Sequence, residues 1–421
     1  MLRPMREKTL ELIYFNAGGG HRAAATAIET IAAQQGRPWR VRCVNLLEVL
    51  DPQGRFEKLT GMAPEALYNK RLAKGWTLGL AQELKLLQGM IRLGHASMVK
   101  KLEQHWLCGE PDMVVSLVPN FNRAMLISLA AALPGVPYVT VLTDMADHPP
   151  NFWIEPDLPQ HLVCGTARAM AQARESGCAE SHLHRTSGMI LRPDFYEPLM
   201  LDRRLEQAQL GLDPDRPTGF VMFGGHGSMA MRSIAEQLSD VQLILLCGHN
   251  APLASKLRAM KSAAKHVAIG FTPDVKRYMQ LADFFIGKPG PASLSEAVQQ
   301  GLPVITVRNA WTMPQERYNT EWVQENRLGI VARSMRKLRP SVVELLSRLD
   351  EFKHNVRQVE NQAIFEVPEI LAGILAAQDT PVPWQAATLG SDGAALSLNR
   401  QDGFQASNRS LAQQIYAGAA I

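Results

Sequence analysis

Short apolar runs that end in turn residues recur along the whole chain. The first begins at Leu10, and the others occupy 41–47, 113–118, 138–143, 220–223, 242–246, 284–286 and 304–307. Helical patterns follow them, and continuous apolar runs of this length are typical of strands buried on both faces of a parallel sheet. The pattern therefore predicts an α/β protein in which two sets of parallel strands alternate with helices.

A stretch rich in Pro, Gly and Asp, residues 210–219, separates the two sets of strands. This composition is typical of a connection rather than of an element interior. A chain of 421 residues has room for two domains of roughly 150 residues or more. We expect an N-terminal domain over 1–210, a C-terminal domain over 217–377, and a flexible tail over 378–421, where isolated apolar residues do not offset the entropy of ordering.

Composition narrows the class of protein. A hydrophobic fraction of 46% with 20% charged residues is that of a soluble globular protein, and a net charge of +4 is too small to indicate nucleic-acid binding. The charged N-terminus leads into only a short apolar run, which predicts neither a signal peptide nor a membrane span. The five cysteines are scattered and lack metal-ligand spacing, so we expect reduced thiols and a cytoplasmic protein.

The first apolar run leads into Gly18-Gly19-Gly20-His21 and then into an alanine-rich helical stretch. This order of strand, Gly-rich turn and helix is where α/β proteins place ligands, because unpaired helix N-terminal amides converge there. The histidine after the glycines can exchange a proton near neutral pH. The alternative is a tight turn in which His21 caps the first helical turn, and the loop alone does not decide between the two.

A second unit of strand, turn and helix spans 287–305. Gly290 lets the backbone approach a ligand closely, and Ser293 offers an amide and a hydroxyl to a phosphate at the helix N-terminus. Glu296 is placed to accept hydrogen bonds from both hydroxyls of a ribose. However, Ser293-Leu-Ser-Glu296 also fits a capping box, in which Glu296 would only satisfy a backbone amide of its own helix.

Several blocks in a fixed order carry a family resemblance. They are the loop 16–25, Thr143-Asp144-Met-Ala-Asp-His148-Pro149 with Trp153, Gly188 with Arg192-Pro193, 247–250, Gly270-Phe271-Thr272, 288–296 and 301–303. Together they resemble the monogalactosyldiacylglycerol synthases and the processive diacylglycerol glucosyltransferases, and more distantly the peptidoglycan N-acetylglucosaminyltransferase. This resemblance spans most of residues 10–330. It implies a GT-B architecture of two facing Rossmann-like domains, transfer from a UDP-sugar without a metal, and inversion at the anomeric carbon.

The resemblance also implies roles for individual residues. His21 is expected to be the base that deprotonates the acceptor hydroxyl, while Asp144 and His148 orient an imidazole or contact acceptor hydroxyls. The expected contacts to the UDP-sugar are Gly19, Gly20, Gly224, Gly225, His226, Phe271, Gly290, Pro291, Ser293, Glu296, Gln315 and Asn319. His226 departs from the small or acidic residue that is usual at its position, and the alternative is that it simply fills the loop. For Gln315 and Asn319 the alternative is an ordinary polar helix start.

Displacement of UDP requires positive charge opposite the departing diphosphate. Helix N-termini at 224–228 and 290–293 can supply it, so we expect no cofactor beyond the UDP-sugar and no metal site. The only D-x-D pattern, Asp213-Pro-Asp215, lies in the connection between the domains and is interpreted as a turn rather than as a metal ligand.

Residues 55–105 bear on the acceptor. They carry nine basic and four acidic residues together with apolar side chains at partly helical spacing. This is typical of a segment that lies on an anionic membrane surface, although two ordinary amphipathic helices packed on a sheet would give the same pattern. With the resemblance, it predicts transfer from UDP-glucose or UDP-galactose to a membrane lipid, first of all diacylglycerol, by a protein attached to the inner face of the cytoplasmic membrane.

Three other functions stay open from the sequence. They are UDP-sugar transfer to a non-glycerolipid acceptor, UDP-sugar 2-epimerisation on the same architecture, and a non-catalytic module that senses a lipid surface or a nucleotide.

Overall fold

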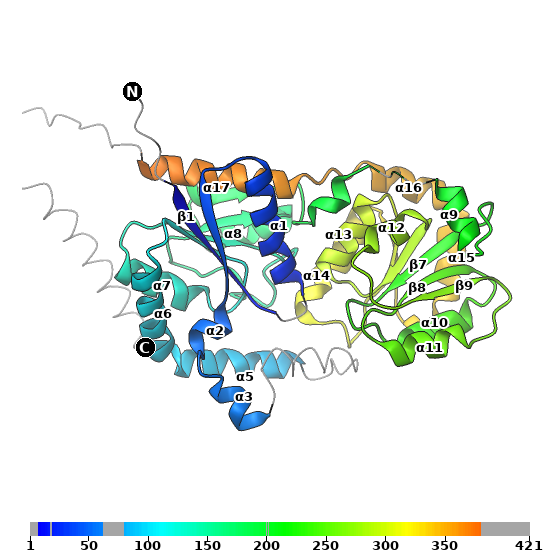
Figure 1. Cartoon of the computed structure of the whole chain (residues 1–421), viewed down its shortest axis with the longest axis horizontal. Helices are drawn as coiled ribbons and strands as arrows, with labels where there is room; N and C mark the ends of the chain where they lie inside the picture. Colours follow the sequence, from blue (N-terminus) through cyan, green and yellow to red (C-terminus); the bar gives the residue numbers. More distant parts are fainter. Residues whose placement is uncertain (1–6, 17–18, 62–79, 199, 201, 380–421) are drawn as a thin grey trace, which may run out of the picture.

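The computed structural model describes residues 7–16, 19–61, 80–198, 200 and 202–379. The predicted tail over 378–421 therefore lies almost wholly outside the described residues. Figure 1 shows two lobes side by side, each built around one sheet of parallel strands. This arrangement confirms the expected fold class of two Rossmann-like α/β domains.

The first lobe holds a six-stranded sheet in the order β2-β1-β3-β4-β5-β6. The strands are β1 Lys8–Tyr14, β2 Trp39–Asn45, β3 Met113–Ser116, β4 Tyr138–Val141, β5 His161–Cys164 and β6 Leu183–Arg185. β1 lies between β2 and β3, and Leu10 pairs in parallel register with Val41 and Met113. Leu10 packs in the core on one face of the sheet, whereas Ile13 packs in the core on the other, which explains the apolar run of β1.

The second lobe holds a six-stranded sheet in the order β12-β11-β10-β7-β8-β9. Its strands are β7 Thr218–Met222, β8 Gln242–Leu246, β9 His266–Ile269, β10 Phe284–Gly287, β11 Val304–Val307 and β12 Gly329–Ala332. Each apolar run predicted as a strand forms one, and β5, β6, β9 and β12 are additional. In both sheets the first strand of the lobe lies inside the sheet, with a neighbour on each side, and the loops after β1 and β7 line one cavity.

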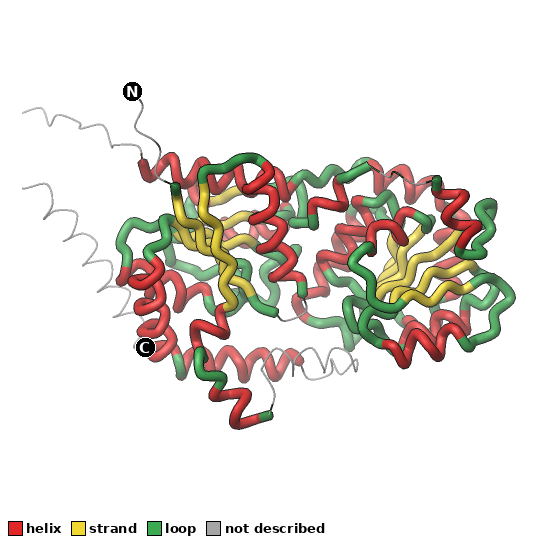
Figure 2. The backbone as a smooth tube through the Cα atoms, in the orientation of Figure 1, coloured by secondary structure: helices red, strands yellow, loops and turns green. Residues whose placement is uncertain are grey.

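Helices pack against both sheets (Figure 2). The helices of the first half are α1 Gly20–Gln34, α2 Leu46–Leu50, α3 Arg55–Thr60, α5 Leu80–Leu93, α6 His95–Gly109, α7 Asn122–Ala132, α8 Ala167–Glu175 and α9 Arg203–Gln209. Those of the second half are α10 Ala230–Gln237, α11 Ala251–Arg258, α12 Val275–Gln280, α13 Pro291–Gln299, α14 Arg317–Glu325, α15 Arg339–Ser347, α16 Leu349–Arg357 and α17 Ala363–Asp379. Short 3-10 turns lie at Glu180–His182, Pro193–Tyr196, Pro314–Glu316 and Met335–Lys337.

The structure shifts both limits of the expected domains. The segment 192–197 is already bonded to the second lobe, because Arg192 donates to the Pro273 carbonyl at 3.2 Å and Lys276 donates to the Glu197 carbonyl at 2.7 Å. At the other end, α17 returns to the first lobe, where Leu371 packs in one core with Leu10 (Figure 1). The first domain thus ends near residue 190 rather than 210, and α17 belongs to it rather than to the second domain.

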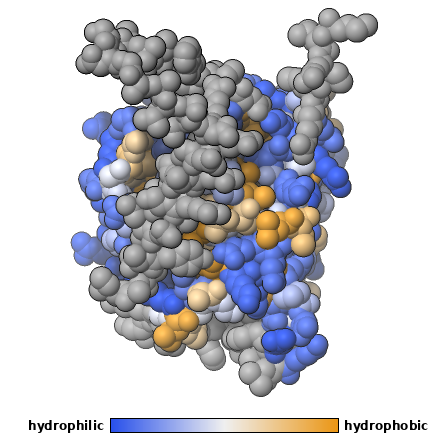
Figure 3. Space-filling view, turned by 90° about the vertical axis from the view of Figure 1, so that its left-hand side faces the viewer, coloured by the Kyte–Doolittle hydropathy of each residue, from blue (hydrophilic) through white to orange (hydrophobic). Residues whose placement is uncertain are grey.

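Figure 3 views the molecule from the end of the first lobe, where apolar side chains form separate patches among hydrophilic ones. On α5 and α6 of this lobe, Met90 is 55%, Leu93 91% and Leu107 56% exposed. Within the described residues, no helix combines the length and the apolar character needed to span a bilayer. Residues 62–79, in the middle of the predicted membrane-facing segment 55–105, lie outside the described residues.

Candidate active site

A cavity of about 570 Å³ lies between the two lobes. Loops that follow β1 and β4 line it from the first lobe, and loops that follow β7, β9 and β10 line it from the second. Ligands of open α/β sheets bind at this carboxyl edge of the strands. Most of the predicted site residues meet here: Gly19, Gly20, His21, Asp144, Gly224, Gly225, Phe271, Gly290, Pro291, Ser293, Glu296 and Gln315.

Three predicted residues do not line this cavity. His148 is half-buried, and its pKa is lowered by removal from water and by the nearby charge of Arg317. His226 is exposed, with its ring centroid 5.8 Å from that of His249. Asn319 is fully buried and donates from Nδ2 to the Pro289 carbonyl at 2.7 Å. It therefore supports the turn that contains Gly290 from the protein interior.

His21 lies in the first turn of α1, half-buried at the wall of the cavity. Its Nδ1 is 3.1 Å from the Thr143 hydroxyl, and its ring centroid is 6.0 Å from that of Trp153. Burial lowers the pKa of His21 to about 4, against a smaller opposing effect of a hydrogen bond with the Leu117 backbone. The N-cap of α1 is Gly19 and carries no side-chain cap, so the capping interpretation of His21 is not supported. At neutral pH the imidazole is uncharged and able to accept a proton.

Asp144 lies beside His21 on the same wall. It accepts a hydrogen bond from Trp153 Nε1 at 3.0 Å, and burial raises its pKa to about 7. Two charges of the facing lobe act on it, since Glu316 raises this pKa and Lys288 lowers it. Lys288 and Glu316 form an ion pair at 2.8 Å across the entrance to α13. Sequence reasoning missed this pair, although Lys288 opens the block 288–296 and Glu316 follows Gln315.

The helix α13 begins at Pro291, with Gly290 as its N-cap. Ser293 therefore lies inside the first turn and Glu296 in the second, which excludes the capping-box interpretation. Among the described residues the Glu296 carboxylate makes no hydrogen bond and no ion pair. Burial raises its pKa to about 7, while Arg192 lowers it and Asp194 raises it. A carboxylate that is not used by the protein and that lines a cavity is available to a ligand.

The glycine-rich loop after β7 packs closely on the loop after β8. Gly224 has φ +73°, and a Cβ on Gly248 would lie 2.1 Å from the Gly225 carbonyl oxygen. The His249 amide donates to this same carbonyl at 2.9 Å. The His249 ring stacks on Phe271 with centroids 4.0 Å apart, and Phe271 is 62% exposed. His249 thus supports the site; the sequence placed it in the block 247–250 but assigned it no role.

The first-lobe side of the cavity has an apolar mouth, formed by Phe15, Leu47, Leu87 and Phe121. Phe15 and Phe121 contact edge to face at 5.4 Å, and Leu87 comes from α5, within the segment 55–105. This side of the cavity is therefore suited to an apolar substrate, whereas the second-lobe side presents amides and charges.

The Asp213-Pro-Asp215 pattern lies before β7, at the edge of the sheet opposite the cavity. Asp215 forms an exposed ion pair with Arg204 at 2.9 Å, and its amide donates to the Asp213 carboxylate at 3.0 Å. This is the geometry of a turn. In the described part of the chain, no group of three His, Cys, Asp or Glu side chains is arranged to hold a metal ion.

Comparison with known proteins shows which enzymes this chain is similar to. Residues 223–372 match the model of the glycosyltransferase family 28 C-terminal domain. The chain is 25% identical to a probable chloroplastic monogalactosyldiacylglycerol synthase of Glycine max and 25% identical to monogalactosyldiacylglycerol synthase 1 of Arabidopsis thaliana, in each case over 86% of this chain and 70% of the relative. The resemblance to these synthases that the sequence motifs indicate is thereby confirmed.

Solved structures agree on the fold. MurG of Acinetobacter baumannii matches with a TM-score of 0.54 at 14% identity, over 87% of this chain and 99% of that one. The calicheamicin glycosyltransferase CalG4 matches with a TM-score of 0.56 at 13% identity, over 89% of this chain and 100% of that one. At such identity the likeness concerns the fold, and it confirms the GT-B architecture.

One expectation is wrong by this comparison. The sequence predicted a cytoplasmic protein on the inner face of the cytoplasmic membrane, whereas the curated relatives are chloroplastic enzymes. Composition and the charge pattern of the first residues do not specify a compartment, which is why the prediction failed. What the fold and the relatives do establish is that this chain is a sugar-transferring enzyme of the GT-B fold, in which residues 223–372 match the glycosyltransferase family 28 C-terminal domain and 86% of the chain is similar to monogalactosyldiacylglycerol synthases.

Proposed function

We propose that this enzyme transfers a hexose from UDP-glucose or UDP-galactose to the hydroxyl of diacylglycerol, with inversion at the anomeric carbon. The observation that carries the proposal is that one cleft pairs an uncharged imidazole, His21, with the Glu296 carboxylate, which has no hydrogen-bond or ion-pair partner within the described part of the chain. The relatives named as monogalactosyldiacylglycerol synthases support a lipid acceptor and a hexose donor.

The donor occupies the second-lobe side of the cleft. The diphosphate lies at the N-terminus of α13, where the amides of Ala292 and Ser293 in the first turn and the Lys288 ammonium group offset its charge. Glu296, one turn further along the helix, accepts hydrogen bonds from the ribose hydroxyls. Phe271 presents its exposed ring to the base, supported from below by the His249 ring.

The acceptor enters through the apolar mouth and places its hydroxyl beside His21. The His21 imidazole takes the hydroxyl proton while the oxygen forms a bond to the anomeric carbon on the face opposite UDP. The bond between the anomeric carbon and the UDP oxygen breaks, and UDP leaves with the bonding electrons. The Thr143 hydroxyl, 3.1 Å from His21 Nδ1, orients the ring for this step.

Charge stabilisation by α13 and Lys288 takes the place that a divalent metal has in other transferases, so we propose that turnover needs neither a metal nor a further cofactor. The apolar side chains on α5, Met90 and Leu93, support contact of this lobe with a lipid surface.

The test is a transfer assay with radiolabelled UDP-glucose, UDP-galactose and UDP-N-acetylglucosamine over vesicles that contain diacylglycerol. We expect a labelled glycolipid from one of the first two donors, in the presence of EDTA, with inverted configuration by NMR. His21→Ala should abolish its formation, whereas the matched control His354→Ala, an exposed histidine on α16, should not.

Three outcomes would contradict the proposal and select another function. A free 2-epimer formed without acceptor would identify an epimerase, and a labelled product on a non-glycerolipid alone would change the acceptor. A protein whose melting temperature does not respond to UDP would be a non-catalytic module.

A further inference from the structure

The two chain crossings between the lobes form a pivot. On the first-lobe side they are joined to each other, because Asn361 Nδ2 donates to the Met189 carbonyl at 2.9 Å and the Gln362 amide donates to the Ser187 hydroxyl at 2.7 Å. On the second-lobe side, Arg192 is bonded to the Pro273 carbonyl and α16 packs in the second core. Leu191 is already buried in the core of the second lobe, so residue 190 and residues 358–360 remain between these anchor points, and rotation of one lobe against the other is concentrated there.

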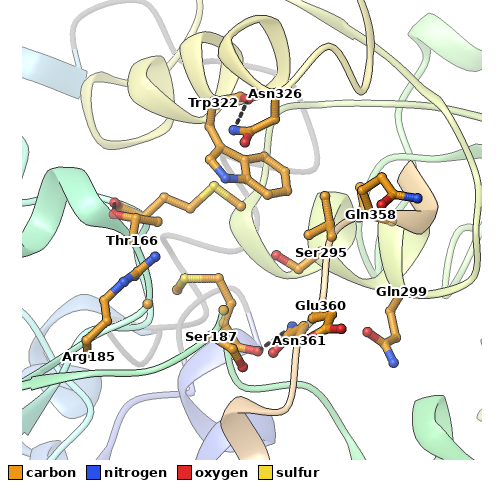
Figure 4. Close-up of a pocket in the computed structure, with 16 residues that line it drawn as sticks. Thr166, Arg185, Ser187, Ser295, Gln299, Trp322, Asn326, Gln358, Glu360 and Asn361 are labelled. Atoms are coloured by element: carbon orange, nitrogen blue, oxygen red, sulfur yellow. Dashed lines mark hydrogen bonds between the residues drawn. The ribbon is translucent and has the colours of Figure 1, made fainter. Parts of the chain in front are cut away.

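A second cavity, of about 230 Å³, lies against this pivot, and we call it the hinge cavity (Figure 4). Thr166, Arg185 and Ser187 line it from the first lobe. Ser295, Gln299, Trp322 and Asn326 line it from the second lobe, and 358–361 close it. A rotation of the lobes therefore changes the shape of this cavity directly.

The hinge cavity contains a cation with spare hydrogen-bonding capacity. Arg185 donates from Nη1 to the Cys164 carbonyl at 3.3 Å, and among the described residues it has no carboxylate partner. Arg185 and Glu360, the acidic side chain of the lining, are both exposed, and the nearby Glu366 carboxylate already accepts from the Ser187 amide at 2.7 Å. In Figure 4 the Arg185 guanidinium points toward the centre of the cavity.

The remaining lining suits a small organic acid. The indole of Trp322 faces the cavity from the side opposite Ser187 (Figure 4), and Met145 and Met189 add apolar surface. The amides of Gln299 and Asn326 and the hydroxyl of Ser295 supply polar groups around it. A guanidinium and such groups are suited to a carboxylate or phosphate, while the indole and the thioethers are suited to a short carbon skeleton.

The hinge cavity also borders the donor cleft. Ser295 lines the hinge cavity and the adjacent Glu296 lines the cleft, so that α13 is the wall between them. Met189 lines both cavities. A ligand that contacts both lobes and the pivot stabilises the lobe arrangement it fits, and donor binding in the cleft depends on that same arrangement.

We propose that the hinge cavity is an effector site for a small oxyanion, either a carboxylate or a phosphate, which is held by Arg185 and coupled to donor binding through α13. Only the coupling rests on the proposed function, because occupancy of the hinge cavity is a separate property.

The test is thermal denaturation of the full chain with succinate and, separately, inorganic phosphate, each against NaCl at equal ionic strength. Saturating UDP is present in one series, so that phosphate does not act at the donor site. We expect at least one anion to raise the melting temperature by about 2–4 °C, with and without UDP. Arg185→Gln should remove this increase, and Arg185→Lys should keep part of it.

The matched control is Arg174→Gln, which alters an exposed arginine of the same lobe that is paired with Glu180. It should leave the anion effect unchanged. A calorimetric titration then tests the coupling, because the anion should tighten UDP binding by the same factor as UDP tightens anion binding.

An absent shift for both anions, or an equal shift in Arg185→Gln, would overturn the effector site. Shifts that depend on Arg185 without any change in UDP affinity would overturn the coupling through α13. If UDP itself has no effect on wild-type stability, the proposed function fails, whereas the anion series without UDP still decides on the hinge cavity.

Discussion

The Glu296 carboxylate is expected to destabilise the unliganded protein at alkaline pH. Burial raises its pKa from 4.5 to about 7 in the folded state. Below pH 4.5 both states hold the proton, so the group has no effect. As pH rises further, the unfolded state loses its proton first, and the free energy of unfolding falls until the folded state has also ionised near pH 7. This difference in pKa corresponds to a loss of about 3 kcal/mol in the free energy of unfolding at most. Because the side chain is partly open to the cleft, we expect a loss of ~1–3 kcal/mol.

Glu296→Gln keeps the shape of the side chain and removes its ionisation. In urea unfolding without ligand, we expect the variant to be more stable than the wild type by ~1–3 kcal/mol at pH 8, and nearly equal to it at pH 4.5. The affinity for UDP should fall by roughly 10- to 100-fold, since a hydrogen bond to a charged group is lost. Glu175→Gln, at the exposed end of α8, is the matched control and should change neither quantity. Equal or lower stability of Glu296→Gln at pH 8 would refute the electrostatic reasoning, and unchanged UDP affinity would refute the ribose contact.

Three further predictions concern the same cleft. His21→Ala should lower kcat by about 10²- to 10⁴-fold in the transfer assay, while calorimetry should show a UDP affinity within roughly twofold of wild type. Because the His21 pKa is about 4 and the base acts when deprotonated, no loss of kcat/KM between pH 8 and pH 6 should trace to His21. Gly290→Ala should weaken UDP binding without unfolding the protein, because the new Cβ would lie on the ligand side, 3.4 Å from Lys288 Cε and 3.7 Å from Glu316 Oε1. Unaltered UDP affinity would contradict a diphosphate at this turn. Phe271→Ala should weaken UDP roughly tenfold at unchanged melting temperature, because the ring is 62% exposed; a large loss of stability would instead indicate a structural role.

Most strands with a continuous apolar sequence could be predicted, with β12 (Gly-Ile-Val-Ala) as an exception, whereas the short strands that carry a histidine could not. β10 and β11 are apolar on both faces and are flanked by turn residues. β5 has four residues and begins with His161, and β6 has three, with His184 and Arg185 among them. Such segments carry too few apolar positions to show a period, and they become strands because they pair with β4 and with each other.

The candidate site shows the same division between local and long-range information. The turn at Gly290 follows from local sequence, because a strand, a Gly-Pro turn and a helix succeed one another within a few residues. The spacing of Ser293 and Glu296 suggested a capping box, but the spacing does not specify where the helix begins. The Pro ring at 291 favours the first helical position, which moves Ser293 inside the helix. The interaction of Asp144 with charges of the facing lobe requires the closed cleft, and no local pattern encodes it.

The charges of Lys288 and Glu316 act on Asp144 and so connect the donor side of the cleft to the acceptor side. Asp144 and His21 share contact with Trp153, and Asp144 has a pKa of about 7 that Glu316 raises and Lys288 lowers. A bound diphosphate adds negative charge beside Lys288, which acts on Asp144 in the same direction as Glu316 and favours its neutral form. Burial already keeps the His21 imidazole uncharged at neutral pH, because its pKa is about 4. Under the proposed function, donor binding therefore favours a neutral Asp144 beside a neutral His21, which takes a proton when the lipid hydroxyl arrives.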